Sequence, residues 1–159
     1  MRDYVILTDS SCDLPAELAR ELGIEVVSLS LLLDGKEYIN YLDGREIGFK
    51  EFYDAIREGK TATTSAANIA TFKEAMKAIV DQGKDVLYIG FSSGLSATVG
   101  AGTNAARELS EEYPDSKIYA VDTLGASLGQ GMIVYYAAKK KAEGASIEEV
   151  RDFVESRKL

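Results

Sequence analysis

Apolar residues along the chain occur either in short continuous runs or in longer stretches with helical spacing. Three runs of mostly apolar residues, at 4–7, 86–91 and 118–121, have the length and the bounding turn residues of buried strands. Apolar residues three or four positions apart predict helices over 14–22, 47–56, 67–80, 96–113, a segment around 132–136, and 147–154. Strands that alternate with helices in this way predict an α/β domain. Its mainly parallel sheet is flanked by helices, as in a Rossmann-like three-layer sandwich.

One region departs from this alternation. Residues 24–33 are rich in β-branched residues and leucine and are long enough for one extended strand. The pair Asp34-Gly35 favours a tight hairpin turn, and residues 36–39 supply the return strand. We therefore expect a small β-hairpin arm around residues 24–39. The polar stretch 61–65 is expected to connect two helices, and the whole chain, 1–159, is expected to form a single α/β domain.

Composition excludes several classes of protein. The chain has 26 acidic and 18 basic residues, so its net charge of −8 argues against a nucleic-acid partner. A single cysteine, Cys12, excludes an internal disulfide and fits a reducing compartment. No apolar run approaches the ~20 residues that span a membrane. We therefore expect a cytoplasmic domain with no membrane span, no cofactor and no metal site. The chain also has no histidine, which removes the commonest general base.

Hydroxyl side chains gather where the predicted strands end. Thr8-Asp9-Ser10-Ser11, Ser92-Ser93 and Asp122-Thr123 each follow a strand, and the carboxyl ends of parallel strands lie along one edge of a sheet. Thr63-Thr64-Ser65 precedes a helix and is expected to join that edge. For any single serine or threonine, capping of the next helix is the stronger interpretation. As a set without lysine or arginine, they suit one carboxylate better than a doubly charged phosphate.

Two patterns in the sequence are typical of catalytic sites and compete with this interpretation. The segment 90–94 matches G-x-S-x-G, which is typical of a hydrolase nucleophile, but the chain offers no histidine to activate the serine. Asp9 and Asp122 follow strands and are candidates for magnesium binding with a phosphorylated substrate. A lone aspartate at a strand end more often caps a turn, and we interpret both residues as caps.

Four segments together resemble the DegV family. They are TDSSCDL at 8–14, TTS at 63–65, SSGLSAT at 92–98 and VDTLGASLGQG at 121–131, and the resemblance runs in order from residue 1 to 159. DegV proteins are bacterial fatty-acid-binding proteins with two domains, and the acyl chain binds at or near the interface between them. Some members present the bound acid to a separate kinase. The resemblance implies that this chain is the first domain. Because it ends at a helix without a capping signal, we expect a truncation after residue 159.

The resemblance also implies which residues hold the ligand. By the family motifs, the carboxylate is bound by Thr64 and by serines of the S-S-G-L-S segment, with Ser93 and Ser96 as the preferred pair. Ser65 and Ser92 are second choices. The sequence departs from the family at Ala66-Ala67, where Gln-Pro is usual, and at Ala97, where glycine is common. The missing second domain commonly supplies a histidine near the carboxylate.

Three functions remain open at this point. The leading one is a lipid-binding protein, not an enzyme, that binds a long-chain fatty acid through its carboxylate and presents it to a fatty acid kinase. The alternative is a hydrolase or phosphotransferase whose remaining catalytic residues lie on a missing second domain. The third is a half-domain that works by pairing with another copy. Such self-association is expected on the face that the missing domain would cover.

Overall fold

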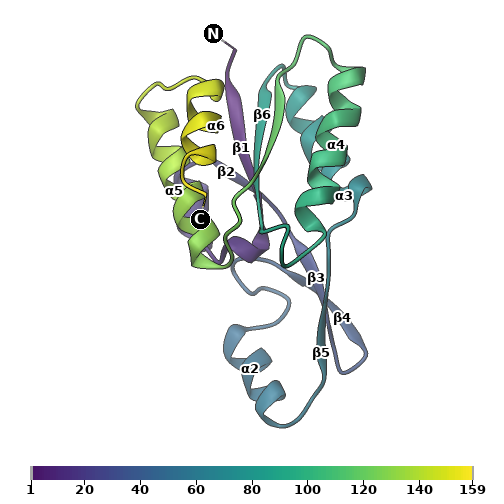
Figure 1. Ribbon diagram of the computed structural model, residues 1–159. Coiled ribbons are helices and arrows are strands. Elements are labelled where there is room, and N and C mark those ends of the chain that lie inside the picture. The colour runs from purple at the N-terminus through teal and green to yellow at the C-terminus, as the bar shows by residue number, and fades with distance from the viewer. Residues whose placement is uncertain (1, 159) are drawn as a thin grey trace.

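A four-stranded parallel sheet forms the centre of the computed structural model, which describes residues 2–158 (Figure 1). Its strands lie in the order β2-β1-β6-β7, and all three pairings are parallel. Their bounds are Tyr4–Asp9 for β1, Ile24–Val27 for β2, Asp85–Gly90 for β6 and Ile118–Asp122 for β7. The chain leaves β1 toward β2 on one side and later returns to β6 on the other. The strand order therefore reverses between β1 and β6, which is where open α/β sheets bind ligands.

Helices cover both faces of this sheet. On one face lie α1 (Ala16–Glu21), α5 (Leu128–Ala142) and α6 (Ile147–Glu155), whose apolar residues share one core with β1 and β6. On the other face lie α3 (Ile69–Val80) and α4 (Thr98–Glu112) over a second core, and Figure 1 shows the two groups on opposite sides. The predicted three-layer α/β fold is thus confirmed. Within the described residues, no helix is both long and apolar enough to cross a membrane.

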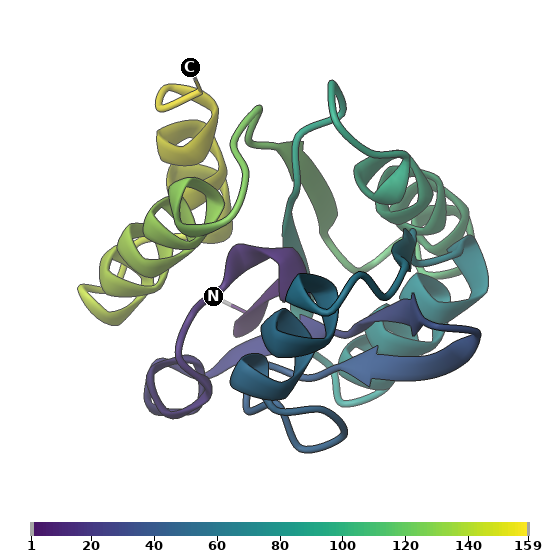
Figure 2. The same ribbon diagram turned by 90° about the horizontal axis from the view of Figure 1, so that it is seen from below.

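A second, antiparallel sheet stands apart from the central one. Its strands lie in the order β4-β3-β5, with β3 at Leu29–Leu33, β4 at Lys36–Asn40 and β5 at Ala62–Ser65. The expected hairpin turn is present, since Asp34 and Gly35 both have positive φ angles, 51° and 81°, as a two-residue turn of this kind requires. Helix α2 (Phe49–Arg57) completes this unit, whose small core contains Leu31, Leu33, Ile47 and Ala55. We call residues 29–65 the arm; Figure 1 shows it beyond one end of the central sheet, and Figure 2 views the molecule from that end.

Two local predictions were wrong. Residues 24–33 form two strands instead of one, because β2 follows β1 only as far as the pair Asp9–Val27. There β1 ends in a 3₁₀ turn, η1 (Ser10–Cys12), and the chain passes through Ser28 into the second sheet. The stretch 61–65 is not a simple connection either: its last four residues form β5, which extends the expected hairpin to three strands.

Candidate ligand-binding site

A pocket of about 490 Å³ lies between the arm and the carboxyl edge of the central sheet. Seven residues with hydroxyl side chains line it: Ser11, Ser30, Thr64, Ser65, Ser96, Thr98 and Ser127. Ser11 follows β1 and Phe91 follows β6, so the pocket sits where the strand order reverses. Apolar side chains, among them Leu29, Leu31 and Leu95, form the rest of its wall. We call it the hydroxyl pocket.

The structure brings three of the five predicted site residues together here. Thr64 and Ser65 lie on β5 of the arm with exposed side chains, and Ser96 lies half-buried just before α4. Ser92 and Ser93 do not line the pocket. The buried Ser92 accepts a hydrogen bond at Oγ from the Gly94 N–H at 3.3 Å. Ser93 is exposed, and its N–H donates to Asp122 Oδ1 at 3.2 Å.

The hydroxyl groups on the body side of the pocket are already oriented by neighbours. Ser96 Oγ accepts from the Thr98 N–H at 3.2 Å and lies 2.9 Å from Thr98 Oγ1. Since the amide supplies one proton to Ser96 Oγ, the proton of that hydroxyl remains available for Thr98 or for a ligand. The Ser127 hydroxyl donates to Asp13, and the Ser11 hydroxyl donates to Asp9. The pocket therefore offers few freely rotating donors on this side, with Ser96 the principal one.

Two helices begin at the hydroxyl pocket. Thr98 is the first residue of α4 and Ser127 directly precedes α5, and neither helix receives a hydrogen bond from the side chain of its N-cap residue, although Ser96 Oγ accepts from the first amide of α4. Helices α3 and α6 begin elsewhere and are capped by Asn68 and Ser146. The first N–H groups of a helix carry partial positive charge and favour an anion. The pocket thus combines neutral hydroxyl donors with two helix N-termini, which suits a carboxylate.

One acidic residue limits the charge that such a ligand can carry. Asp13 lines the hydroxyl pocket, and among the described lining residues it is the single charged one. No lysine or arginine of residues 2–158 joins it in the lining. A like charge beside the ligand disfavours binding. The arrangement therefore fits a monoanion better than a phosphate with two charges.

A buried polar network holds Ser11 and Phe91, two of the residues that line the pocket. Asp9 is fully buried, and its carboxylate accepts five hydrogen bonds: from Ser11 N and the Ser11 hydroxyl, from Tyr88 Oη at 2.9 Å, from Phe91 N at 3.3 Å and from Gln130 Nε2 at 3.3 Å. Burial and the adjacent Asp9 carboxylate raise the pKa of Tyr88 far above its usual range, so the phenol stays protonated. The ends of β1 and β6 and the start of α5 are thereby held in one arrangement.

The interpretation of the two aspartates as caps agrees with these contacts. Asp9 is the N-cap of η1, and Asp122 accepts hydrogen bonds from Ser93 N and Leu124 N. Burial acts to raise the pKa of Asp122, but its hydrogen bonds with Ser93 and Leu124 outweigh it, and that pKa lies below its ordinary value. Within residues 2–158, no group of three or more His, Cys, Asp or Glu side chains is placed to hold a metal ion.

Several residues of the site were not anticipated from the sequence. Ser30, Asn40 and Ser127 line the pocket, and the completely buried Gln130 donates hydrogen bonds to Thr8 and Asp9. Gly131 is the residue of the sequence that signals a close contact here, because a Cβ atom at this position would lie 2.4 Å from the Cys12 carbonyl oxygen. Only glycine lets α5 approach η1 this closely. That approach brings Ser127 and Gln130 to the edge of the sheet.

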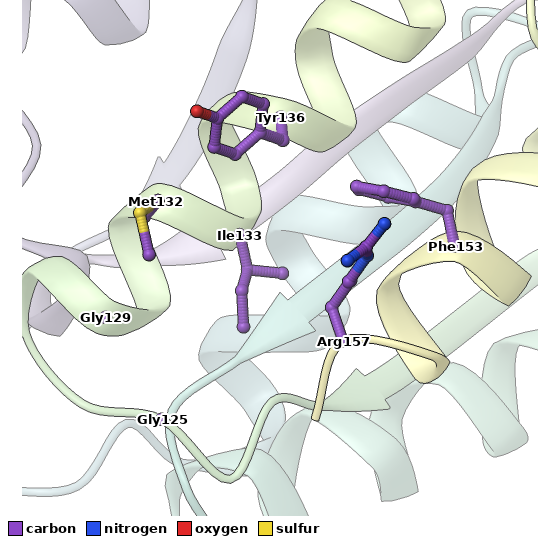
Figure 3. Close-up of a pocket in the computed structure, with 7 residues that line it drawn as sticks. All are labelled: Gly125, Gly129, Met132, Ile133, Tyr136, Phe153 and Arg157. Carbon is purple, nitrogen blue, oxygen red and sulfur yellow. The ribbon is translucent and has the colours of Figure 1, made fainter. Parts of the chain in front are cut away.

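A second, apolar pocket of about 450 Å³ lies between α5 and the end of α6 (Figure 3). Met132, Ile133 and Tyr136 of α5 face Phe153 and Arg157 across it. Leu128, Met132 and Tyr136 are 60%, 58% and 51% exposed, at successive i, i+4 positions of α5. We call these three residues the α5 stripe.

The apolar pocket and the hydroxyl pocket are close neighbours. Gly125 and Gly129 line the apolar pocket, and the intervening Ala126 and Ser127 line the hydroxyl pocket, so a single turn of the chain separates the two pockets.

Comparison with known proteins places this architecture in a family. Residues 3–158 match the model of the family described as uncharacterised proteins of the DegV family. A DegV domain-containing protein of Clostridium perfringens is 44% identical over 158 residues, which are 99% of this chain and 54% of that protein. The chain thus spans about half the length of the curated relatives that it matches.

Solved structures agree with this match. A DegV family protein from Thermus thermophilus, described as fatty-acid-binding, is 34% identical, with a TM-score of 0.86 over 99% of this chain and 54% of that one. A Thermotoga maritima protein described as revealing a fatty acid binding function is 29% identical, with a TM-score of 0.84 over 99% of this chain and 55% of that one. The motifs, the fold and the family model agree throughout, and the chain belongs to the DegV family.

Proposed function

We propose that this chain binds a long-chain fatty acid and holds its carboxylate in the hydroxyl pocket. One observation carries the proposal: hydroxyl groups of the arm, Thr64 and Ser65, meet Ser96 of the body beside the N-termini of two helices, α4 and α5. Hydrogen bonds from such groups stabilise a monoanion without a salt bridge. The relatives described as fatty-acid-binding support the same ligand class.

The five predicted site residues have different roles in this proposal. Thr64 and Ser96 are the principal donors from the two sides, and Ser65 is the second donor from the arm. Ser92 and Ser93 belong to the same turn as Ser96, but neither lines the pocket: Ser92 Oγ accepts from the Gly94 N–H, and the Ser93 N–H donates to Asp122. They take part only if the 92–96 turn rearranges on binding.

The apolar wall gives the acyl chain its first contacts. Leu29, Leu31 and Phe91 line the hydroxyl pocket, and Leu95 at its edge is 68% exposed. Each buried methylene contributes about 0.8 kcal/mol, so a long chain binds tightly even though the head group is held by neutral donors. Affinity is therefore expected to rise with chain length.

A carrier role without turnover follows from this arrangement. Ser92, at the centre of the G-x-S-x-G segment, is 5% exposed, and its Oγ accepts a hydrogen bond from the Gly94 N–H, which suits a structural serine more than a nucleophile. We infer that the protein presents the bound acid to a separate fatty acid kinase in the cytoplasm, where Cys12 remains reduced and buried. The fatty acid is the ligand, and no cofactor is part of the proposal.

The first experiment asks whether the purified protein carries a fatty acid. Lipid extracted under denaturing conditions is identified by mass spectrometry, and the stripped protein is titrated with palmitate. The proposal expects a stoichiometric fatty acid and saturable rebinding. A protein that carries no lipid, binds no palmitate and hydrolyses esters would instead support the enzyme alternative.

A further inference from the structure

We propose that Ser10 is a positioning residue: its hydroxyl holds the arm against the body and so sets the spacing between the two halves of the hydroxyl pocket. Ser10 is 1% exposed and does not line that pocket, so it acts through other residues. The consequence for ligand binding rests on the proposed function. The mechanical role of Ser10 rests only on its hydrogen bonds with the arm.

One hydroxyl oxygen receives two donors from the base of the arm. Ser10 Oγ accepts a hydrogen bond from the Leu29 N–H at 3.0 Å and another from Asn40 Nδ2 at 3.3 Å. Leu29 and Asn40 are directly paired across β3 and β4. Ser10 therefore binds both strands of the hairpin at the point where they leave the body.

The rest of the arm is built to move as a unit. Its core of Leu31, Leu33, Ile47 and Ala55 is separate from both cores that cover the central sheet. The chain enters the arm through Ser28, between β2 and β3, and leaves it through the short segment between β5 and α3. Leu42 is a further half-buried contact with the core on the α1 side. With so little shared packing, the two hydrogen bonds of Ser10 have a large share in fixing the arm.

The position of Ser10 links the buried Asp9 network to the arm. Asp9, immediately before it, is locked by five hydrogen bonds. Beyond it, β3 is paired with β5, with Ser30 opposite Ser65 and Leu31 opposite Thr64. A shift of β3 therefore carries Thr64 and Ser65 with it, while Ser96 stays with the body. Loss of the Ser10 hydroxyl is expected to change the Thr64–Ser96 spacing without touching either residue.

Alanine at position 10 would leave the Leu29 N–H and the Asn40 amide without this acceptor. Water then satisfies both groups by entering between the arm and the body, which favours a more open arrangement. A ligand carboxylate that bridges Thr64 and Ser96 opposes this opening. Binding of the acid therefore has to close the arm in Ser10→Ala, whereas in the wild type Ser10 already holds it closed.

Spin labels test the mechanical role without any ligand. Cysteines replace the exposed Glu37 on β4 and Glu111 on α4, while the native Cys12 is buried and stays unlabelled. Pulsed electron resonance then compares the distance distribution in the parent, in Ser10→Ala and in Ser110→Ala. Ser110 is a matched control, because its hydroxyl donates within α4, to the Ala106 carbonyl. We expect a broader and longer distribution only in Ser10→Ala; an unchanged distribution overturns the proposal.

A binding series then tests the consequence for the ligand. Palmitate and 1-hexadecanol, which lacks the carboxylate, are titrated into the wild type, Ser10→Ala, Ser10→Thr and Ser110→Ala. We expect Ser10→Ala to weaken palmitate about tenfold and hexadecanol much less, with Ser10→Thr restoring affinity because it keeps the hydroxyl. Equal losses for both ligands would mark Ser10 as merely structural and contradict the inference.

Two further results distinguish a failure of the Ser10 inference from a failure of the proposed function. If Ser10→Thr does not fold, Asn40→Ala serves instead; it removes one of the two donors and is expected to give an intermediate distance distribution. Because Asn40 itself lines the hydroxyl pocket, the distance distribution is the readout for this variant, and an unchanged distribution contradicts the inference. A wild type that binds no palmitate overturns the proposed function, and the distance measurement still decides the role of Ser10.

Discussion

The Ser127 hydroxyl donates a hydrogen bond to the Asp13 carboxylate, which joins the start of α5 to the turn after β1. Both residues line the hydroxyl pocket, and both have positive φ angles, 51° and 54°. Backbone strain of this kind is concentrated at functional sites in proteins. The contact orients Ser127, but it also places a negative charge beside the proposed carboxylate.

Asp13→Asn is therefore expected to strengthen fatty-acid binding. Asparagine keeps a side-chain oxygen for Ser127 and tolerates the left-handed conformation, so the backbone is preserved. Removing one like charge gains about 1 kcal/mol, or roughly fivefold in affinity. Calorimetric titration with palmitate at pH 8 measures the change. Asp115→Asn, at an exposed aspartate remote from the pocket, is the control, and an unchanged or weaker affinity in Asp13→Asn contradicts the charge argument.

Asp9→Ala is expected to destabilise the fold strongly. Five donors converge on this buried carboxylate, and several of them would lose their acceptor. A loss of about 3 kcal/mol or more corresponds to a decrease in Tm of roughly 6–12 °C in a domain of this size. Thermal unfolding followed by circular dichroism measures it. Magnesium should leave Tm unchanged in the wild type; a magnesium-dependent increase that Asp9→Ala abolishes would revive the phosphotransferase alternative.

The contribution of Asp122 to stability is expected to depend on pH. Its pKa is lower in the folded protein than its ordinary value, so the folded state binds the proton less readily than the unfolded chain. The stabilisation is present above the unfolded-state pKa of about 3.9 and is lost as the pH falls through the lower folded-state pKa. Urea unfolding of the wild type and Asp122→Asn should therefore differ at pH 7 and converge below pH ~3. A difference that persists in acid would show that the carboxylate charge is irrelevant.

The α5 stripe is expected to promote association of the 159-residue chain. Leu128, Met132 and Tyr136 are exposed beside an apolar pocket, and apolar patches of this kind favour contact with another surface. Sedimentation should detect dimers, and binding of a hydrophobic dye should detect an exposed apolar surface. The double variant Leu128→Gln, Met132→Gln should reduce both, whereas Lys139→Gln, at an exposed lysine of the same helix, should not. A monodisperse wild-type monomer that binds no dye at high concentration would contradict this prediction.

The fold class followed from local patterns, because buried strands and amphipathic helices leave clear periodicities in a sequence. The break at Ser28 did not, since residues 24–33 have one continuous strand-like composition. What divides them is the end of their partner β1 at Asp9, which is a long-range fact. Strand β5 was missed for the same reason: its threonines form a strand only because β3 lies beside them.

The site was predictable as a set of hydroxyl loops, but not residue by residue. Ser93 and Ser96 belong to one motif, yet Ser96 lines the pocket and Ser93, whose N–H donates to Asp122, does not. Periodicity does not reveal the orientation of side chains within a four-residue turn. Likewise, Gln130 reaches Asp9 only because Gly131 lets α5 approach η1, a contact between residues more than a hundred positions apart.

Recognition of the carboxylate by Thr64 and Ser96 is the central claim, and head-group discrimination tests it most directly. Palmitate and methyl palmitate are titrated into the wild type, Thr64→Ala, Ser96→Ala and the Ser110→Ala control. A hydrogen bond to a charged group contributes ~1.5–3 kcal/mol, so each site variant should weaken palmitate roughly tenfold to hundredfold while methyl palmitate stays weak throughout. Equal affinity of the wild type for acid and ester, or unchanged palmitate affinity in both site variants, would contradict the account.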